Sequence, residues 1–215
     1  EQQNALLAGK KIVLGVTGGI AAYKAVEITS RLKKAGAEVH IIMTRGAENF
    51  VTELTFREIS NQPVTTDIGQ GAALPLEHIA LATFADAVLI APATANVIAK
   101  AAAGIADDML TTTLLATKAP VFVAPAMNTN MYEAPVTQRN LRDLAARGWH
   151  IIEPASGMLA CGVSKGRLPE PAAIVQELTA FFAKGQALAG KKVLVTAGGT
   201  IEPLDPCATS ATART

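Results

Sequence analysis

Residues 10–19 read Lys10-Lys-Ile-Val-Leu-Gly-Val-Thr-Gly-Gly19, an apolar run that ends in a pair of glycines. A short apolar run bounded by glycine is typical of a strand that is buried on both faces of a sheet. Apolar side chains with helical spacing follow over residues 20–35 and stop at Gly36. Glycine is the residue that most often ends a helix. The sequence therefore begins with a strand, a tight turn and a helix.

The same alternation of strands and helices continues along the chain. The predicted strands are residues 38–43, 87–91, 121–124 and 149–152, and the predicted helices are residues 51–60, 76–84, 95–103, 107–117, 133–147 and 172–183. Such alternation produces βαβ units, whose crossovers place helices on both faces of a parallel sheet. We therefore expect an α/β fold with a Rossmann-like open parallel sheet. The glycine- and proline-rich connection at 153–171 is expected to be a lid or a disordered link.

Composition narrows the classes of function. Half of the 215 residues are hydrophobic, 17% are charged, and the net charge is +1 without any basic run. Nucleic acid is therefore not an expected partner. No uninterrupted apolar stretch is long enough to span a membrane. Two distant cysteines, Cys161 and Cys207, and three scattered histidines provide neither a disulfide framework nor a metal-binding spacing, which favours a cytoplasmic protein.

The turn after the first strand, within Gly15-Val-Thr-Gly-Gly-Ile-Ala-Ala-Tyr-Lys24, is a candidate phosphate site. Glycines allow the backbone to approach a phosphate, whose charge is stabilised by the N-terminus of the following helix. The turn has neither the Gly-x-Gly-x-x-Gly pattern of dinucleotide sites nor a P-loop pattern. It therefore favours a mononucleotide such as FMN, bound at Gly18, Gly19 and Ile20. A tight turn without any ligand is the alternative.

Two further loops follow predicted strands, at Met43-Thr44-Arg45 and at Ala91-Pro-Ala-Thr-Ala-Asn96. Ligands of open α/β sheets bind at the carboxyl ends of the strands, so these loops and the glycine turn are expected to form one pocket. Helix capping by Thr or Asn is the alternative for each loop taken alone. The expected cofactor contacts in the two loops are Thr44, Pro92, Ala93, Thr94, Ala95 and Asn96.

A fourth loop, Pro125-Ala-Met-Asn-Thr-Asn-Met-Tyr132, follows the predicted strand at 121–124. Its Asn128 offers an amide in an apolar frame, which suits a carboxylate or the edge of a flavin. His78 begins a predicted helix and could act as a general base, although a lone histidine is more often a surface or capping residue. Cys161 lies in a glycine-rich stretch and could be a nucleophile, a proton donor or a surface thiol.

The order of these motifs carries a resemblance. Gly-Gly-Ile-Ala-Ala-Tyr-Lys, His78, Ala-Pro-Ala-Thr-Ala-Asn, the octapeptide at 125–132 and the Cys161 stretch occur in one sequence, which resembles the flavin-containing cysteine decarboxylases. Residues 9–183 are similar to the decarboxylase half of bacterial bifunctional flavoproteins of coenzyme A biosynthesis. In those proteins a phosphopantothenoylcysteine decarboxylase is joined to a phosphopantothenate–cysteine ligase. The resemblance implies a flavoprotein fold, FMN as cofactor, and a homo-oligomer that is a trimer or a dodecamer.

The resemblance also implies a reaction, the conversion of 4′-phosphopantothenoylcysteine to 4′-phosphopantetheine. The flavin oxidises the substrate thiol to a thioaldehyde, carbon dioxide leaves, and the reduced flavin and a proton return the enethiolate to a thiol. By the same resemblance His78 is the base, Asn128 holds the substrate carboxylate and Cys161 donates the final proton. Further candidate substrate contacts are Ala126, Met127, Lys165 and Arg167.

Residues 1–183 are expected to form the FMN-binding cysteine decarboxylase domain, followed by a linker at 184–190. Residues 190–199 repeat the pattern of residues 9–19. Residues 191–206 resemble the opening of the ligase half, with a sixth strand of the same sheet as the alternative. The tail at 207–215 has no aliphatic residue larger than Ala and is expected to be disordered. Ligase activity is expected to be absent. The alternative functions are a peptidyl-cysteine decarboxylase and a non-catalytic, flavin-binding regulatory homologue.

Overall fold

A six-stranded parallel sheet forms the centre of the computed structural model, which describes residues 6–66, 77–159 and 162–186. The strand order is β3-β2-β1-β4-β5-β6, the order of doubly wound nucleotide-binding folds. The predicted α/β fold with an open parallel sheet is therefore confirmed. The strands are β1 (Lys11–Val16), β2 (Glu38–Met43), β3 (Val64–Thr65), β4 (Ala87–Ala93), β5 (Val121–Pro125) and β6 (His150–Ile151).

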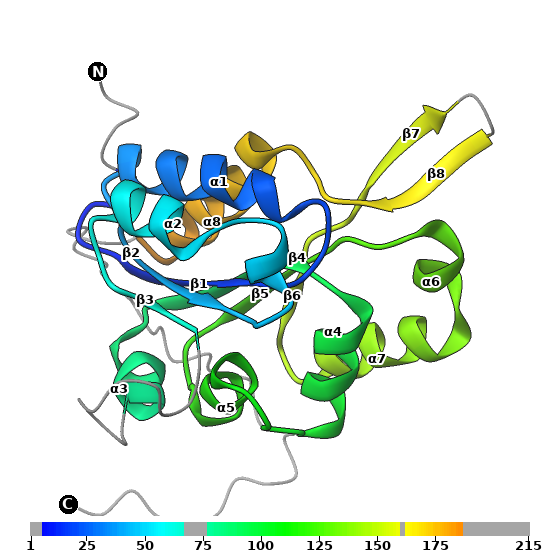
Figure 1. Ribbon diagram of the computed structural model, residues 1–215, viewed down its shortest axis with the longest axis horizontal. Coiled ribbons are helices and arrows are strands. Elements are labelled where there is room, and N and C mark those ends of the chain that lie inside the picture. The colour runs from blue at the N-terminus through cyan, green and yellow to red at the C-terminus, as the bar shows by residue number, and fades with distance from the viewer. Residues whose placement is uncertain (1–5, 67–76, 160–161, 187–215) are drawn as a thin grey trace, which may run out of the picture.

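Helices cover both faces of the sheet (Figure 1), with α1, α2 and α8 on one face and α3, α4, α5 and α7 on the other. Neighbouring residues of a strand point to opposite faces, so Val13 and Leu14 of β1 belong to two separate apolar cores. Both side chains are fully buried. The helices are α1 (Ala22–Lys34), α2 (Glu53–Ser60), α3 (Glu77–Phe84), α4 (Ala95–Ala103), α5 (Met109–Ala116), α6 (Thr129–Glu133), α7 (Pro135–Ala146) and α8 (Pro171–Gln186), and a short 3-10 turn, η2, spans Ala47–Asn49.

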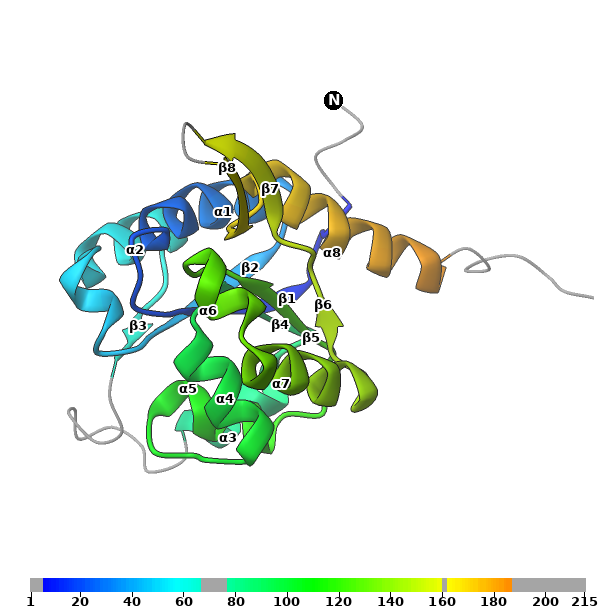
Figure 2. The same cartoon turned by 90° about the vertical axis from the view of Figure 1, so that its right-hand side faces the viewer.

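The connection at 153–171, expected to be a lid or a disordered link, contains an antiparallel hairpin. Its strands are β7 (Ala155–Leu159) and β8 (Gly162–Arg167). Figures 1 and 2 show the hairpin projecting beyond the sheet, past the carboxyl ends of the strands. The expectation of an unstructured link was therefore wrong for these two strands. Hydrogen bonds to the loop after β5 hold the base of the hairpin. The hairpin could not be predicted because the local sequence does not indicate such long-range contacts.

The helix expected at 133–147 is divided into α6 and α7. Ala134 separates them with an extended ψ of 130°. The residue before a proline is disfavoured in helical conformation, and Pro135 takes the first position of α7. The proline thus ends one helix and begins the next.

The last described helix, α8, reaches Gln186, so residues 184–186 of the expected linker are helical. The rest of that linker, the ligase-like stretch at 191–206 and the tail at 207–215 lie outside the described residues. No helix within the described ranges has the length and apolar character needed to cross a membrane.

Candidate functional site

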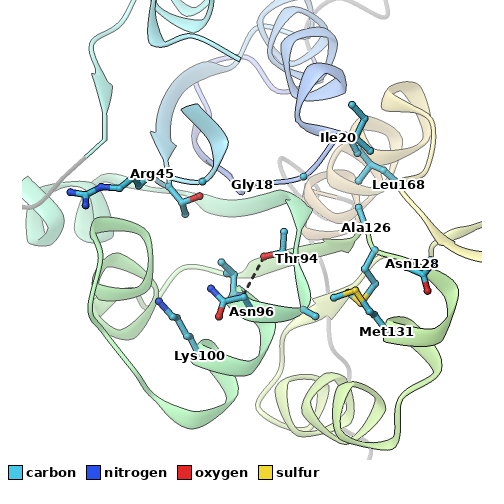
Figure 3. Close-up of a pocket in the computed structure, with 18 of the residues that line it drawn as sticks. Gly18, Ile20, Arg45, Thr94, Asn96, Lys100, Ala126, Asn128, Met131 and Leu168 are labelled. Carbon is cyan, nitrogen blue, oxygen red and sulfur yellow. Dashed lines mark hydrogen bonds between the residues drawn. The ribbon is translucent and has the colours of Figure 1, made fainter. Parts of the chain in front are cut away.

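A cavity of about 940 Å³ opens at the carboxyl ends of β1, β2, β4 and β5 (Figure 3). Its volume lies at the upper end of the ~300–1,000 Å³ range of small-molecule sites. The four loops singled out in the sequence meet here, as expected from the strand order. Predicted site residues that line the cavity are Gly18, Gly19, Ile20, Thr44, Thr94, Ala95, Asn96, Ala126, Met127, Asn128 and Arg167.

Some predicted site residues do not line the cavity. Pro92 and Ala93 are buried within β4, where their carbonyl groups accept hydrogen bonds. Lys165 is exposed on β8, where its Nζ forms an ion pair of 3.0 Å with Glu133. His78 is the second residue of α3, but its side chain lies outside the described part of the chain. Cys161 falls between β7 and β8 and also lies outside the described residues.

The glycine turn brings two loops into backbone contact. A Cβ atom added to Gly18 would lie 2.6 Å from the carbonyl carbon of Gly46, a distance that side chains do not reach. The same atom added to Gly19 would have Thr94 Cγ2 as its nearest neighbour, at 3.9 Å. The first position therefore requires glycine because the loop after β2 is so close. The second has free space beside it, so its backbone is open to a ligand at the N-terminus of α1.

Hydrogen bonds outside the regular strand ladders join the four loops and the hairpin. We refer to this set as the loop belt. Because its bonds run from one loop to the next, the belt fixes the loops relative to each other. Its backbone bonds run from Thr44 N–H to the Val16 carbonyl (3.0 Å), from Ala126 N–H to the Ala93 carbonyl (3.0 Å) and from Met127 N–H to the Gly166 carbonyl (2.9 Å).

Two lysines of the cavity wall form ion pairs. Lys100 Nζ lies 2.8 and 2.9 Å from the two carboxylate oxygens of Asp107, and Lys24 Nζ lies 2.9 Å from Glu170 Oε1. The hydrogen bond from Lys100 holds the pKa of Asp107 below its ordinary value, and the bond from Lys24 does the same for the pKa of Glu170. Each of these two lysines therefore lines the cavity as one member of an ion pair. Neither lysine was among the site residues predicted from the sequence.

A signal for one of the missed lysines was available. Lys100 lies four residues after Asn96 in α4, and residues four apart share one face of a helix. Figure 3 shows Asn96 and Lys100 on the same side of α4. Asp107 had no comparable signal, since it follows the left-handed Gly104 in a connection of irregular structure.

Asn128 lies at the start of α6 and is exposed to the cavity. Its Oδ1 accepts a hydrogen bond of 2.8 Å from Asn130 N–H, which caps the helix. An Asn amide has both an acceptor oxygen and two N–H donors. Because the oxygen is held by the helix, the donors are the part of the amide that can face a carboxylate.

Exposed apolar side chains border the cavity. Ile20 is 77% exposed, Tyr23 is 60% exposed and Met131 is 50% exposed. All three line the cavity. Figure 3 shows Ile20 and Met131 at different sides of the opening. An apolar border of this kind suits a flat aromatic ring or the uncharged part of a substrate.

A family model named Flavoprotein matches residues 1–183. The chain belongs to the Flavoprotein family. This family member is 52% identical over 202 residues to the coenzyme A biosynthesis bifunctional protein CoaBC of Vibrio cholerae, and 50% identical over 205 residues to that of Bacillus subtilis. The matches cover 93% and 94% of the chain and 50% of each relative. The chain thus spans about half the length of the curated relatives it matches.

Solved structures support the same family assignment. SpaF, described as an FMN-dependent cysteine decarboxylase, matches with a TM-score of 0.73 and 32% identity, covering 82% of this chain and 99% of that one. A PPC decarboxylase mutant complexed with pantothenoylaminoethenethiol matches with a TM-score of 0.71 and 32% identity, covering 81% and 98%. The FMN binding protein AtHal3 matches with a TM-score of 0.72 and 31% identity, covering 81% and 97%. The flavoprotein fold and the resemblance found in the sequence are confirmed.

Proposed function

We propose that this chain binds FMN and converts 4′-phosphopantothenoylcysteine to 4′-phosphopantetheine with release of carbon dioxide. The observation that carries the proposal is the meeting of two loops at one cavity. The glycine turn at Gly18 and the octapeptide loop with Asn128 line the same space. A flavin and a cysteine carboxylate held by these loops would lie within one enclosure. The names of the relatives, coenzyme A biosynthesis bifunctional proteins, support this substrate.

The residues present fit FMN. The open backbone at Gly19 and the N-terminus of α1 suit its phosphate, and Thr44 lies beside them on the cavity wall. Ile20 and Met131 offer apolar contacts for its ring. When bound, FMN would supply the two-electron oxidation of the substrate thiol and the later return of those electrons.

The chain's own residues would bind and orient the substrate. Asn128 would donate its amide N–H groups to the carboxylate, because its oxygen is engaged in capping α6. Ala126 and Met127 would shape the wall beside that carboxylate, and Arg167 would add positive charge at the base of the hairpin. Loss of carbon dioxide requires the bond from Cα to the carboxylate to align with the π orbitals of the neighbouring thioaldehyde, and Asn128 would hold the carboxylate in that orientation.

Two further roles rest on the motif resemblance. His78 would take a proton from the substrate, and Cys161 would donate the proton that the carbon gains after carbon dioxide leaves. The overall reaction consumes one proton and is neutral in electrons, since those removed from the thiol are returned. Lys165 would lie near the bound substrate. Its backbone is held by the hydroxyl group of Thr129, which bonds both the carbonyl and the N–H of Lys165.

The proposal includes assembly and location. We place the chain in a homo-oligomer, a trimer or a dodecamer, in the cytoplasm. Exposed apolar side chains support association, among them Leu115 on α5 at 64% exposure.

A visible absorption spectrum of the purified chain, recorded with FMN and then with 4′-phosphopantothenoylcysteine in the absence of oxygen, tests the proposal. We expect a bound-flavin spectrum and release of carbon dioxide from the substrate. A flavin-binding chain that releases none would instead support the non-catalytic regulatory homologue. A chain that takes up no FMN would contradict the cofactor assignment.

The peptidyl-cysteine decarboxylase remains the second candidate, because a structure described as the peptidyl-cysteine decarboxylase EpiD shares the fold, with a TM-score of 0.69 at 23% identity. A peptide substrate must end in cysteine, since the reaction consumes a free α-carboxylate. Release of carbon dioxide from such a peptide, and not from 4′-phosphopantothenoylcysteine, would favour this alternative.

A further inference from the structure

The hydroxyl group of Thr17 forms the joint of the loop belt between β1 and β4. Thr17 is fully buried immediately after β1. Its Oγ1 donates a hydrogen bond of 2.7 Å to the Pro92 carbonyl and accepts one of 3.0 Å from the N–H of Thr94. A single hydroxyl thus holds the backbone on both sides of Ala93. Thr17 itself does not line the cavity.

Regular strand pairing ends just before this point. The paired residues of β1 and β4 run as far as Gly15 and Ile90, and the pairing of β4 with β5 is irregular between Ile90 and Ala93. The ladder with β1 therefore stops before Ala91, and the ladder with β5 resumes only at the pair of Ala93 with Pro125. On the β1 side the Thr17 hydroxyl binds the backbone of Pro92 and Thr94, and on the β5 side the Ala126 N–H binds the Ala93 carbonyl.

The consequence reaches the cavity through Thr94. This residue binds Thr17 by its backbone, and its Oγ1 accepts a hydrogen bond of 3.4 Å from Val97 N–H at the start of α4. Ala95 and Asn96 follow directly and line the cavity. The place of these two residues therefore depends on where Thr17 holds the backbone of Thr94.

Two other buried threonines show that burial alone does not produce such bonds. Thr29 and Thr113 are fully buried in helices, and each hydroxyl donates to the carbonyl four residues earlier in its own helix. That local bond is the ordinary way to satisfy a buried threonine. The two bonds of Thr17 cross 75 and 77 residues of sequence.

We propose that Thr17 is a positioning residue for the bound flavin, acting through the backbone of residues 92–94. The inference rests on the proposed function, since it concerns the FMN pocket. Replacing Thr17 with valine keeps the shape of the side chain but removes both hydrogen bonds. The Pro92 carbonyl and the Thr94 N–H then lose their partner, and the loop gains other conformations. FMN binding must select the original one, which weakens affinity.

The test compares FMN dissociation constants and bound-flavin spectra among four variants. Thr17→Val is expected to weaken FMN binding roughly ten- to hundredfold and to shift the absorption maxima of the bound flavin. Thr17→Ser keeps the hydroxyl and is expected to restore both measurements to near the wild-type result. Thr29→Val loses a buried hydroxyl of the local kind and is expected to leave both unchanged. Thr17→Ala, which leaves room around the deleted groups, serves if the valine variant does not fold.

The inference would be overturned if Thr17→Val bound FMN with the affinity and the spectrum of the wild type. If Thr17→Val does not fold, the same result in Thr17→Ala would overturn it. Misfolding of both while Thr29→Val folds would also overturn it, because Thr17 would then serve the fold alone. The wild-type chain is measured first. If it binds no FMN, the proposed function fails, whereas equal binding by wild type and variant removes only the role of Thr17.

Discussion

The N–H group of Met127 donates a hydrogen bond of 2.9 Å to the carbonyl oxygen of Gly166, and this bond attaches the β7–β8 hairpin to the octapeptide loop. Gly166 has a φ of +91°, and a Cβ atom added to it would lie 2.7 Å from the Met127 carbonyl oxygen. The hairpin therefore lies too close to the loop for any side chain at this position.

The substitution Gly166→Ala is expected to separate the hairpin from the loop. We expect the rate of carbon dioxide release to fall at least about tenfold, because the hairpin residues that line the cavity beside Met127 and Asn128 are displaced. FMN affinity should change little, since the close contacts of an added Cβ at Gly166 are with Met127 and Tyr132 and not with the glycine turn. Steady-state kinetics and a flavin titration measure the two effects.

Gly148→Ala provides the matched control. Gly148 has a φ of +90° but no heavy atom within 4 Å of an added Cβ. It should lose ~1–2 kcal/mol of stability from backbone strain, without the loss of turnover. Equal losses of turnover in the two variants would show that strain, and not hairpin contact, explains the result.

The contact between Gly18 and Gly46 leads to a second prediction. Gly18→Ala should force the loops after β1 and β2 apart and weaken FMN binding about tenfold or more, at a cost of ~1–3 kcal/mol in stability from overpacking. Gly19→Ala, where the nearest protein atom is 3.9 Å away, should keep the stability of the wild type, but its methyl group enters the space proposed for the phosphate and should also weaken FMN binding. Thermal melting and a fluorescence titration of FMN with each chain compare the two variants. An unchanged melting temperature in Gly18→Ala would contradict the contact argument.

Asn128→Asp separates the capping role of Asn128 from its proposed substrate role. The carboxylate can still accept the bond from Asn130 N–H, so α6 and FMN binding should persist. The amide donors are lost and a negative charge faces the substrate carboxylate, so carbon dioxide release should fall on the order of a hundredfold. Asn130→Asp makes the same chemical change at an exposed residue that does not line the cavity. Full turnover in Asn128→Asp would remove Asn128 from substrate binding.

His78→Asn tests the proposed base. Carbon dioxide release should be abolished while the bound-flavin spectrum stays, because the substitution removes a titratable group and leaves the glycine turn intact. His40→Asn is the control, since His40 bonds Glu38 and packs on Phe84 away from the cavity. Turnover that survives His78→Asn would exclude His78 from the mechanism.

Acid should weaken the attachment of α8 to α1 through Glu170. The hydrogen bond and charge of Lys24 hold the pKa of this carboxyl below its ordinary value of 4.5. A carboxyl group whose pKa is lowered in the folded state stabilises the protein at pH values above its ordinary pKa. This stabilisation disappears as the pH falls through the lowered pKa. The melting temperature of the wild type should therefore fall more on acidification than that of Glu170→Gln. Because Glu170 is largely exposed, the difference should be small. Glu177→Gln, an exposed change within α8, should not produce this difference.

Much of the fold could be predicted because its strands are buried on both faces. The apolar runs at 38–43 and 121–124 need no knowledge of their neighbours, and the structure has strands at Glu38–Met43 and Val121–Pro125. The two-residue strand β3 was missed, because so short a segment carries no periodicity. The hairpin was missed because its bonds to Met127 and Thr129 come from distant sequence.

The candidate site was predictable to the extent that it depends on strand ends. Ligand loops follow the carboxyl ends of parallel strands, so Thr44 and Thr94 could be named in advance. Thr17 could not, because its significance comes from bonds to residues 75 and 77 positions away. Pro92 and Ala93 were wrongly predicted to line the cavity for a similar reason. Sequence order does not show which members of a loop turn inward.

Three joints of the loop belt consist of backbone groups alone, and this arrangement bears on how the family can diversify. A backbone N–H or carbonyl is present whatever side chain a residue carries, so most side chains on these loops can change while the frame of the cavity persists. Solved structures that share only 32% to 23% of their residues with this chain keep its fold. New substrate preferences could thus arise by exchanging side chains at 126–131 on an inherited scaffold, without a new architecture for each one.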